Sequence, residues 1–460
     1  MSAPVLDRAQ VPPRGPLRPF HFTPVHRRRL ANGLTILVAE QRTFPVVTVD
    51  LLLDAGGRAE PGERAGVAVM TTTLLESGAG SLDAEEIAER VDGLGLSLDS
   101  GVSWDTGQAG FTCLRARLEA GFELLADLIR RPTFPEAEVE RVREERLTTI
   151  QQRRGTPSSV ADEAQSRWIF APGTAFARPL GGMEWTVEEI HRGEISAFHA
   201  RRYRAAGATL VAAGDASVDE IVALAERWFG DWEGTGEPSP PAVVRPRLDQ
   251  TTIVLVDRPG TVQSEIRIGH IGIERTAPDY AAVTVMNAIL GGTFTSRLNL
   301  NLRERLGYTY GVSSSFASRR QQGTFGMQTA VQTEVTAHSV SEMLRDMREI
   351  REAPVTHAEL DDARNFLAGV FPLGLQTTDG VAGKLTSIAT YGLPDDYYDH
   401  YRDQLLAVTA DDVLDAAQRR LWPDRAAVVI AGDAQKIRGE LEALDVGPVI
   451  VADPAELEAE

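Results

Sequence analysis

The sequence predicts an α+β fold of two homologous domains, each an antiparallel sheet covered by helices, in a clamshell arrangement. The 460-residue chain contains pairs of similar segments. TLVAAGD ends at Asp215 and AAVVIAGD ends at Asp433. VTVDLLLDAG (47–56) corresponds to SEIRIGHIGI (264–273) at nearly the same offset. Solenoid repeats run roughly 20–50 residues, so this much longer period indicates two copies of a whole domain.

Each copy begins with strands and continues with helices, an order that indicates α+β, with antiparallel sheets covered on one side. The Asn32-Gly33 pair between apolar runs predicts a hairpin turn. TVEE (186–189) and THAE (356–359) carry the Ser/Thr-x-x-Glu signature of a helix N-terminus. We therefore expect helices to begin after Thr186 and Thr356.

The boundaries of the domains follow from composition. GDWEGTGEPSPPAVVRPR is rich in Gly and Pro and has no apolar period, which is typical of a linker. The predicted units are an irregular N-terminal arm, the first repeat, the linker and the second repeat, at residues 1–24, 25–229, 230–248 and 249–460.

The bulk composition excludes several classes of protein. A net charge of −19 argues against nucleic acid as a partner; it indicates either solubility or an acidic chamber for basic peptides. No run reaches the roughly 18 apolar residues that span a bilayer, so no membrane partner is expected. The N-terminal residues lack the apolar core of a secretory signal, which predicts a cytoplasmic protein. Cys113 is the single cysteine and is expected to be buried.

One segment carries the most specific pattern, GGTFTSRLNLNLRERLGYTYGVSSSF (291–316). With the two copies of about 220 residues, the linker and the AGD near each copy's end, it resembles the pitrilysin or insulinase family of zinc peptidases. The mitochondrial processing peptidase and insulin-degrading enzyme belong to this family. The resemblance extends from about residue 25 to residue 445.

The resemblance implies an inverted zinc motif, H-x-x-E-H, on a helix of the first copy after a Gly-Val-Ala or Gly-Leu-Ala lead-in. The lead-in is present and begins at Gly66. Val69 and Thr73 then stand at the two histidine positions and Thr72 at the position of the general base. The family's third ligand, a glutamate on a downstream helix, corresponds to Leu147. The zinc motif is therefore degenerate.

No shift of register restores the motif, because the chain has no histidine between His26 and His191. Zinc prefers imidazole and thiolate ligands. The carboxylates of the downstream helix suit Mg²⁺ or Ca²⁺ better, and a charged helix of this kind is more typical of a solvated face. We expect no metal and no cofactor in this chain.

The second copy retains the residues that the family contributes from the half opposite the zinc. By resemblance, Arg303 grips a substrate carbonyl and Tyr310 stabilises the oxyanion of the tetrahedral intermediate, with Tyr308 as a rival for the tyrosine role. Such donors contribute about 2.7–4 kcal/mol each. By the same resemblance, Gly291 and Gly292 form a loop that contacts substrate; a turn ending a helix is the alternative.

These observations imply the non-catalytic subunit of a heterodimeric zinc metallopeptidase. The expected partners are a homologous zinc-bearing subunit and an unfolded or short peptide substrate. The alternative is a non-proteolytic binding or scaffold protein that resembles the core subunits of respiratory complexes. An autonomous hydrolase with an unrecognised site is a third possibility, against which the missing histidines count.

Overall fold

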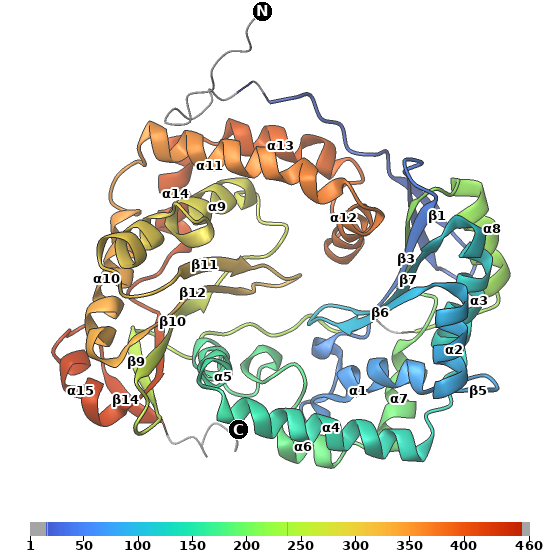
Figure 1. The fold of residues 1–460 in the computed structure, drawn as a ribbon, viewed down its shortest axis with the longest axis horizontal. Helices are drawn as coiled ribbons and strands as arrows, with labels where there is room; N and C mark the ends of the chain where they lie inside the picture. Colours follow the sequence, from blue (N-terminus) through green and yellow to red (C-terminus); the bar gives the residue numbers. More distant parts are fainter. Residues whose placement is uncertain (1–14, 16, 237, 453–460) are drawn as a thin grey trace, which may run out of the picture.

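The computed structural model describes residues 15, 17–236 and 238–452, and the predicted α+β class with two domains is confirmed. Within these residues, two six-stranded sheets lie on opposite sides of the molecule, each with its helices (Figure 1). Most of the predicted N-terminal arm, residues 1–14 and 16, lies outside the described residues. Cys113 is buried in the first core, as predicted.

The first sheet has the strand order β1-β2-β8-β3-β7-β6. Its strands are β1 (His26–Arg29), β2 (Thr35–Glu40), β3 (Val46–Leu53), β6 (Ser97–Val102), β7 (Gly107–Leu114) and β8 (Thr209–Gly214). The hairpin predicted from Asn32-Gly33 joins β1 to β2, with Gly33 at φ +95°. A separate short ribbon pairs β4 (Gly78–Ala79) with β5 (Leu82–Asp83).

The second sheet repeats the first, with the order β14-β9-β13-β10-β12-β11. Its strands are β9 (Thr252–Asp257), β10 (Gln263–Ile271), β11 (Val312–Ala317), β12 (Thr324–Gln332), β13 (Ala427–Gly432) and β14 (Val449–Ala452). The AGD-containing strands β8 and β13 occupy equivalent central positions, which confirms the internal repeat. Both sheets are mixed rather than wholly antiparallel, because β8 and β13 return after long helical connections and pair parallel with β2 and β9.

Fifteen α-helices surround the sheets in the described part of the chain. Those of the first repeat are α1 (Val67–Thr73), α2 (Ala84–Leu94), α3 (Leu118–Arg130), α4 (Glu136–Gly155), α5 (Pro157–Ile169), α6 (Glu184–Glu188), α7 (Arg192–Arg202) and α8 (Val218–Phe229). Those of the second are α9 (Tyr280–Asn287), α10 (Thr336–Glu349), α11 (His357–Val370), α12 (Thr378–Tyr391), α13 (Tyr397–Ala407), α14 (Ala410–Arg420) and α15 (Ala434–Glu442).

The two predicted helix caps have different outcomes. Thr356 caps α11 in a full capping box with Glu359, as predicted. The prediction for Thr186 is wrong, because α6 begins two residues earlier and Thr186 lies inside it. Its hydroxyl instead donates to the carbonyl of Ala65 at 2.8 Å and receives the amide of Met183 at 2.9 Å.

Helix α12 of the second repeat packs on the first sheet, against β2, β3 and β8 (Figure 1). Leu385 and Ile388 of α12 share one buried cluster with Leu37, Leu52 and Val211 of that sheet. Burying such side chains contributes about 1.5–3 kcal/mol each. The first sheet therefore depends on the second repeat to cover one of its faces.

Helix α5 of the first repeat makes the reciprocal contact, lying on β10 and β13 of the second sheet. Ala161, Ala164 and Ile169 of α5 are buried with Val254 and Val429 of that sheet. Each repeat thus packs one of its helices on the sheet of the other repeat. Apolar surface of each half is buried against the other half.

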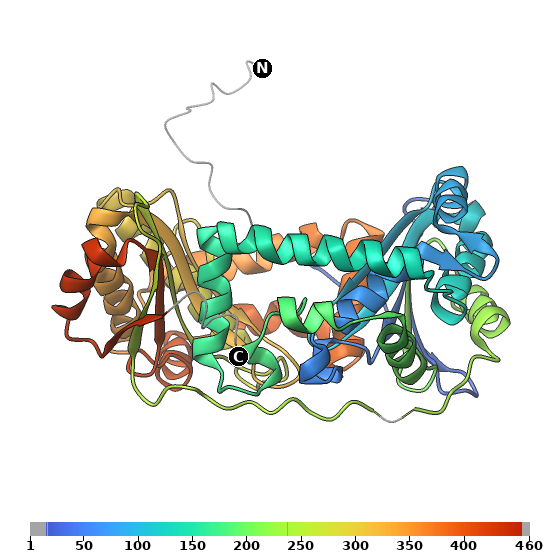
Figure 2. The same cartoon turned by 90° about the horizontal axis from the view of Figure 1, so that it is seen from below.

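The connection between the repeats runs along one side of the molecule (Figure 2). Its described residues, between the end of α8 at Phe229 and the start of β9 at Thr252, form no helix or strand beyond an isolated bridge of Pro246 with Phe170. In the part of the chain that the structure describes, no helix is both long enough and apolar enough to cross a membrane.

The start of α12 meets β3 through hydroxyl and carboxyl groups. Thr48 and Thr112 donate hydrogen bonds to Asp379 at 2.5 and 2.8 Å. Asp50, further along β3, is buried, and this burial raises its pKa to about 6; a hydrogen bond from Gln108 opposes the rise. Nearby carboxylates raise it further.

Substituting Asp50 by Asn should change how stability depends on pH. Because the pKa of Asp50 is raised in the folded state, the native protein binds more protons than the unfolded chain between about pH 4 and 6, and wild-type stability falls as pH rises through that window. The free energy of unfolding of the variant, relative to that of wild type, should rise by about 2 kcal/mol between pH 4.5 and pH 7.5. Urea unfolding at several pH values measures this difference. The same substitution at Asp403, which is exposed and does not act on Asp50, is the control; a pH-independent difference at Asp50 would contradict the assignment.

Candidate functional site

Helix α1 begins at a tightly packed glycine whose backbone is in the left-handed region. Gly66 has φ +99°, and a Cβ there would lie 2.8 Å from the carbonyl oxygen of Gly181. A buried carboxylate caps the helix, since Glu60 Oε2 accepts from the amides of Gly66 (3.2 Å) and Ala68 (3.0 Å). Arg178 contacts the other oxygen of Glu60. The packing around Gly66 and the cap from Glu60 therefore explain the Gly-Val-Ala segment, although no metal ligand follows it.

The positions that correspond to the zinc motif lie on α1 and α4, two helices that pack together. Val69 is half-buried and Thr73 is exposed. Thr72 is buried, and its hydroxyl shares a 2.9 Å hydrogen bond with the hydroxyl of Tyr203. Leu147 of α4 is half-buried against the first hydrophobic core. None of these four side chains has the nitrogen, thiolate or carboxylate donors that zinc takes.

Neighbouring histidines do not replace the missing ligands. His191 bonds to the guanidinium of Arg143 through Nδ1, and His199 Nε2 lies 2.8 Å from the carbonyl oxygen of Ile129. His199 also stacks on Tyr203, with ring centroids 4.5 Å apart. Among the residues that the structure describes, no group of three or more His, Cys, Asp or Glu side chains is arranged to hold a metal ion. The donor set of this half does not fit zinc.

Gly291 and Gly292 end the π-helical turn Ala288–Gly292, which continues α9. Neither glycine has a positive φ. A Cβ on Gly291 would lie 2.6 Å from Ser314 Oγ, and one on Gly292 would lie 2.8 Å from Asn287 Nδ2. Close packing against β11 therefore explains Gly291, and the same segment is a helix end. Their role toward a substrate remains a prediction.

Arg303 lies near the end of a second π-helical segment, Asn299–Arg305. Its guanidinium stacks 3.3 Å from the ring centroid of Phe294 and donates to the carbonyl oxygen of Phe294 at 3.1 Å. It also donates to Glu304 at 3.0 Å. A cation held on an aromatic face is oriented without being neutralised by that face. The sequence analysis missed Phe294. The feature that could have indicated it is its position as an aromatic residue among the small and polar residues of GGTFTSR.

The two candidate tyrosines have different environments. Gly307, at φ +66°, forms the corner between the π-helical segment and β11. Tyr310 is fully exposed (102% of its reference area), and its hydroxyl has no hydrogen-bond partner among the described residues. Tyr308 is half-buried, and its hydroxyl bonds to His338 Nδ1 at 2.9 Å. Within the described residues no hydrogen bond or ring contact joins Arg303 to Tyr310, so the structure does not bring them together as a preformed pair.

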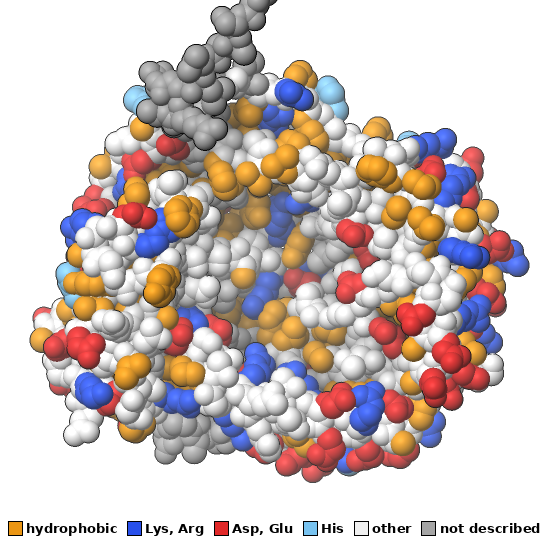
Figure 3. Space-filling view, viewed as in Figure 1, with side chains coloured by type: hydrophobic (Ala, Val, Ile, Leu, Met, Phe, Trp, Pro, Cys, Tyr) orange, Lys and Arg blue, Asp and Glu red, His pale blue; other side chains and the backbone are white. Residues whose placement is uncertain are grey.

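The centre of the molecule is hollowed between the two halves (Figure 3). Hydrophobic, basic and acidic side chains all appear around this hollow on the face shown. An acidic chamber was one of the two interpretations of the net charge. The face shown does not display one.

Two family models match the chain. Residues 35–171 match the insulinase family, peptidase family M16, and residues 189–367 match the model described as peptidase M16 inactive domain. An uncharacterized zinc protease of Mycobacterium leprae is 25% identical over 414 residues, covering 90% of this chain and 93% of that protein. The uncharacterized zinc protease YmxG of Bacillus subtilis is 23% identical over 363 residues, covering 77% and 85%.

Solved structures agree with these matches. The peptidase M16 inactive domain from Pseudomonas fluorescens superposes with a TM-score of 0.81 at 28% identity, covering 89% of this chain and 98% of that chain. A protease from Helicobacter pylori gives a TM-score of 0.82 at 18% identity, with 89% and 99% covered. The second comparison bears on the fold alone.

Proposed function

This chain belongs to the insulinase family of peptidases, family M16, and from that premise we propose that it is the metal-free subunit of a heterodimeric zinc metallopeptidase. The observation that carries the proposal is helix α1, which keeps the family's glycine lead-in but has Val69, Thr72 and Thr73 where zinc ligands and a general base would stand. A homologous partner subunit would then hold the zinc and the general base.

The first half of this chain supports the proposal, because its polar groups near α1 are already hydrogen-bonded within the chain. The hydroxyl of Thr72 bonds to Tyr203, and His199 bonds to a backbone carbonyl. A threonine hydroxyl is neither a good zinc ligand nor a base near neutral pH. Peptide hydrolysis by this chain would therefore require groups from another polypeptide.

The second half offers donors for a substrate held across the interface. Arg303 would bind a backbone carbonyl oxygen of the peptide, with its guanidinium supported by Phe294. The exposed hydroxyl of Tyr310 would donate to the carbonyl oxygen as negative charge develops there. Both roles call for side chains that are not consumed by contacts within the chain, and Tyr310 meets this condition best.

Reconstitution with a zinc-bearing homologue tests the function. We expect the isolated chain to contain no stoichiometric zinc and to cleave no peptide. Mixed with its partner, it should give peptidase activity that a chelator abolishes. The control is the same partner with its zinc-ligating histidines replaced. If the complex forms but never cleaves peptides, the scaffold alternative holds; tightly bound zinc and unaided cleavage by the isolated chain would overturn the proposal.

A further inference from the structure

A cavity of about 380 Å³ lies where the first repeat, the linker and the second repeat meet. Five arginines line it: Arg58, Arg201, Arg202, Arg204 and Arg320. They come from the turn after β3, from the end of α7 and the residues after it, and from the turn between β11 and β12. Asp54 is the single carboxylate among the described lining residues.

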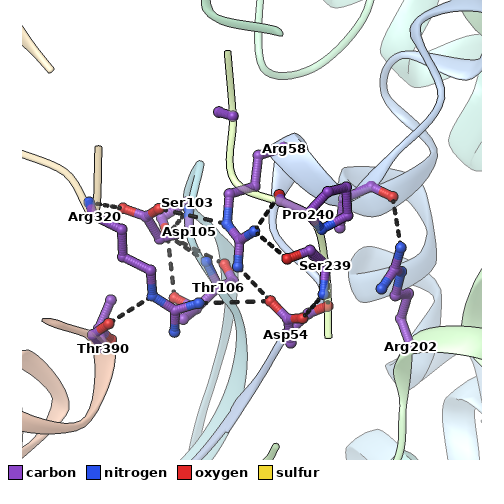
Figure 4. Close-up of polar contacts among 12 residues, drawn as sticks. Asp54, Arg58, Ser103, Asp105, Thr106, Arg202, Ser239, Pro240, Arg320 and Thr390 are labelled. Atoms are coloured by element: carbon purple, nitrogen blue, oxygen red, sulfur yellow. Dashed lines mark hydrogen bonds and ion pairs between the residues drawn. The ribbon is translucent and has the colours of Figure 1, made fainter. Parts of the chain in front are cut away.

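The inner wall of the cavity connects all three parts of the chain (Figure 4). Arg58 donates to the linker carbonyls of Ser239 (3.2 Å) and Pro240 (2.9 Å) and pairs with Asp54. Arg320 of the second repeat pairs with the same Asp54 at 3.6 Å and donates to the carbonyl of Thr390 at 2.6 Å. One carboxylate thus serves two guanidinium groups from different repeats.

The inner wall is balanced in charge, because Arg58 and Arg320 face Asp54 and Asp105, but one donor of Arg58 lacks a hydrogen bond. The side chain of Arg58 is 4% exposed, and its Nε has no hydrogen-bond partner in the described structure. On that side, Asp105 Oδ1 lies 3.6 Å from the Nε of Arg58. Burial lowers the pKa of Arg58; Asp54 and Asp105 oppose this, while the charge of Arg320 adds to it. An additional anion would stabilise the charged form of this guanidinium.

The outer wall adds three more arginines. Arg204 pairs with Glu233, a largely exposed residue, and Arg202 donates to the carbonyl of Ala59 at 3.5 Å. Arg201 is exposed and forms no ion pair within the described residues. Among the described residues, three carboxylates form ion pairs with these arginines, namely Asp54, Asp105 and Glu233. The arginines that line the cavity therefore outnumber the described carboxylates that pair with them.

We propose that this cavity binds the phosphate group of a small molecule. Guanidinium groups match the geometry of a phosphate with paired hydrogen bonds. The volume exceeds that of one tetrahedral oxyanion, so a diphosphate fits the cavity better than inorganic phosphate. The bound anion would tie the linker to both repeats and stabilise the folded chain by mass action. This inference does not depend on the peptidase function.

Calorimetric titration of the full-length chain with pyrophosphate, at ionic strength held constant with NaCl, tests the site. We expect saturable binding, and a Tm that begins to rise near Kd and then increases with the logarithm of the pyrophosphate concentration. Inorganic phosphate should bind more weakly, which distinguishes a diphosphate from free phosphate. Arg201→Gln and Arg204→Gln should each raise Kd by about tenfold or more, the amount lost with one charge-assisted hydrogen bond. Both residues are at least partly exposed, so the variants should fold.

Arg42→Gln is the matched control, because Arg42 is an exposed arginine that pairs with Glu40 and does not line the cavity. Its Kd for pyrophosphate should equal that of wild type. The proposal is overturned if pyrophosphate does not bind at constant ionic strength, or if the Arg201 and Arg204 variants bind as tightly as the control. Citrate binding equal to pyrophosphate binding would overturn the assignment to phosphate.

Discussion

Replacing Tyr310 by Phe lowers the turnover of the assembled heterodimer by about ten- to a thousandfold and leaves the amount of heterodimer unchanged; this is the expected result if its hydroxyl stabilises the oxyanion. Tyr310 is fully exposed, and its hydroxyl forms no hydrogen bond to any described residue. The substitution should therefore not disturb folding. The measurement is kcat with saturating partner, together with sedimentation of the complex.

Tyr308→Phe is the matched control, since it removes the same hydroxyl from a residue two positions away. That hydroxyl is already bonded to His338, so turnover should stay close to wild type. Arg303→Ala should reduce turnover within the same range as Tyr310→Phe. Full activity of the Tyr310 variant, or loss of activity only with the Tyr308 variant, would remove Tyr310 from the mechanism.

Replacing Arg178 by Met should lower the free energy of unfolding by about 3–5 kcal/mol, the usual cost of removing one partner of a buried ion pair. The side chain of Glu60 has no exposed area, and Arg178 is its charged partner. Without the guanidinium, a buried carboxylate would remain at the start of α1 with only two backbone amides as donors. Urea unfolding at pH 7 measures the effect.

The control for this prediction is Arg419→Met. Arg419 forms an ion pair with Asp415 in which both side chains are more than half exposed, and such pairs contribute at most about 1 kcal/mol. Glu60→Gln provides a second comparison, because the amide oxygen can still accept a backbone hydrogen bond without carrying charge. A loss below about 1 kcal/mol for the Arg178 variant would show that Glu60 is not an uncompensated buried charge.

Local interactions account for the parts of the fold that the sequence could predict. The turn at Asn32-Gly33 and the cap at Thr356 depend on residues within a few positions of each other, so spacing alone reveals them. Thr186 carries the same signature as Thr356, yet its hydroxyl bonds to Ala65. A competing partner far away in sequence decides that case, and no local pattern contains it.

The candidate site shows the same division. The resemblance assigned Val69, Thr72 and Thr73 to one helix and Leu147 to another, and the structure has α1 packed on α4. It could not reveal that Phe294 lies beneath Arg303, or that the hydroxyl of Tyr310 is free of partners in the described structure while that of Tyr308 is not. The first fact depends on the fold of residues 294–303, and the second depends on the turn at Gly307 that leads into β11.

The exchange of α5 and α12 between the repeats has a consequence for synthesis on the ribosome. The strands β2, β3 and β8 leave the exit tunnel long before residues 378–391, which form α12. Until α12 emerges, the nascent chain displays an apolar sheet face that nothing of its own can cover, and such surfaces are prone to aggregation. We therefore expect the newly made first repeat to need a chaperone, or to remain loosely folded, until α12 has been synthesised.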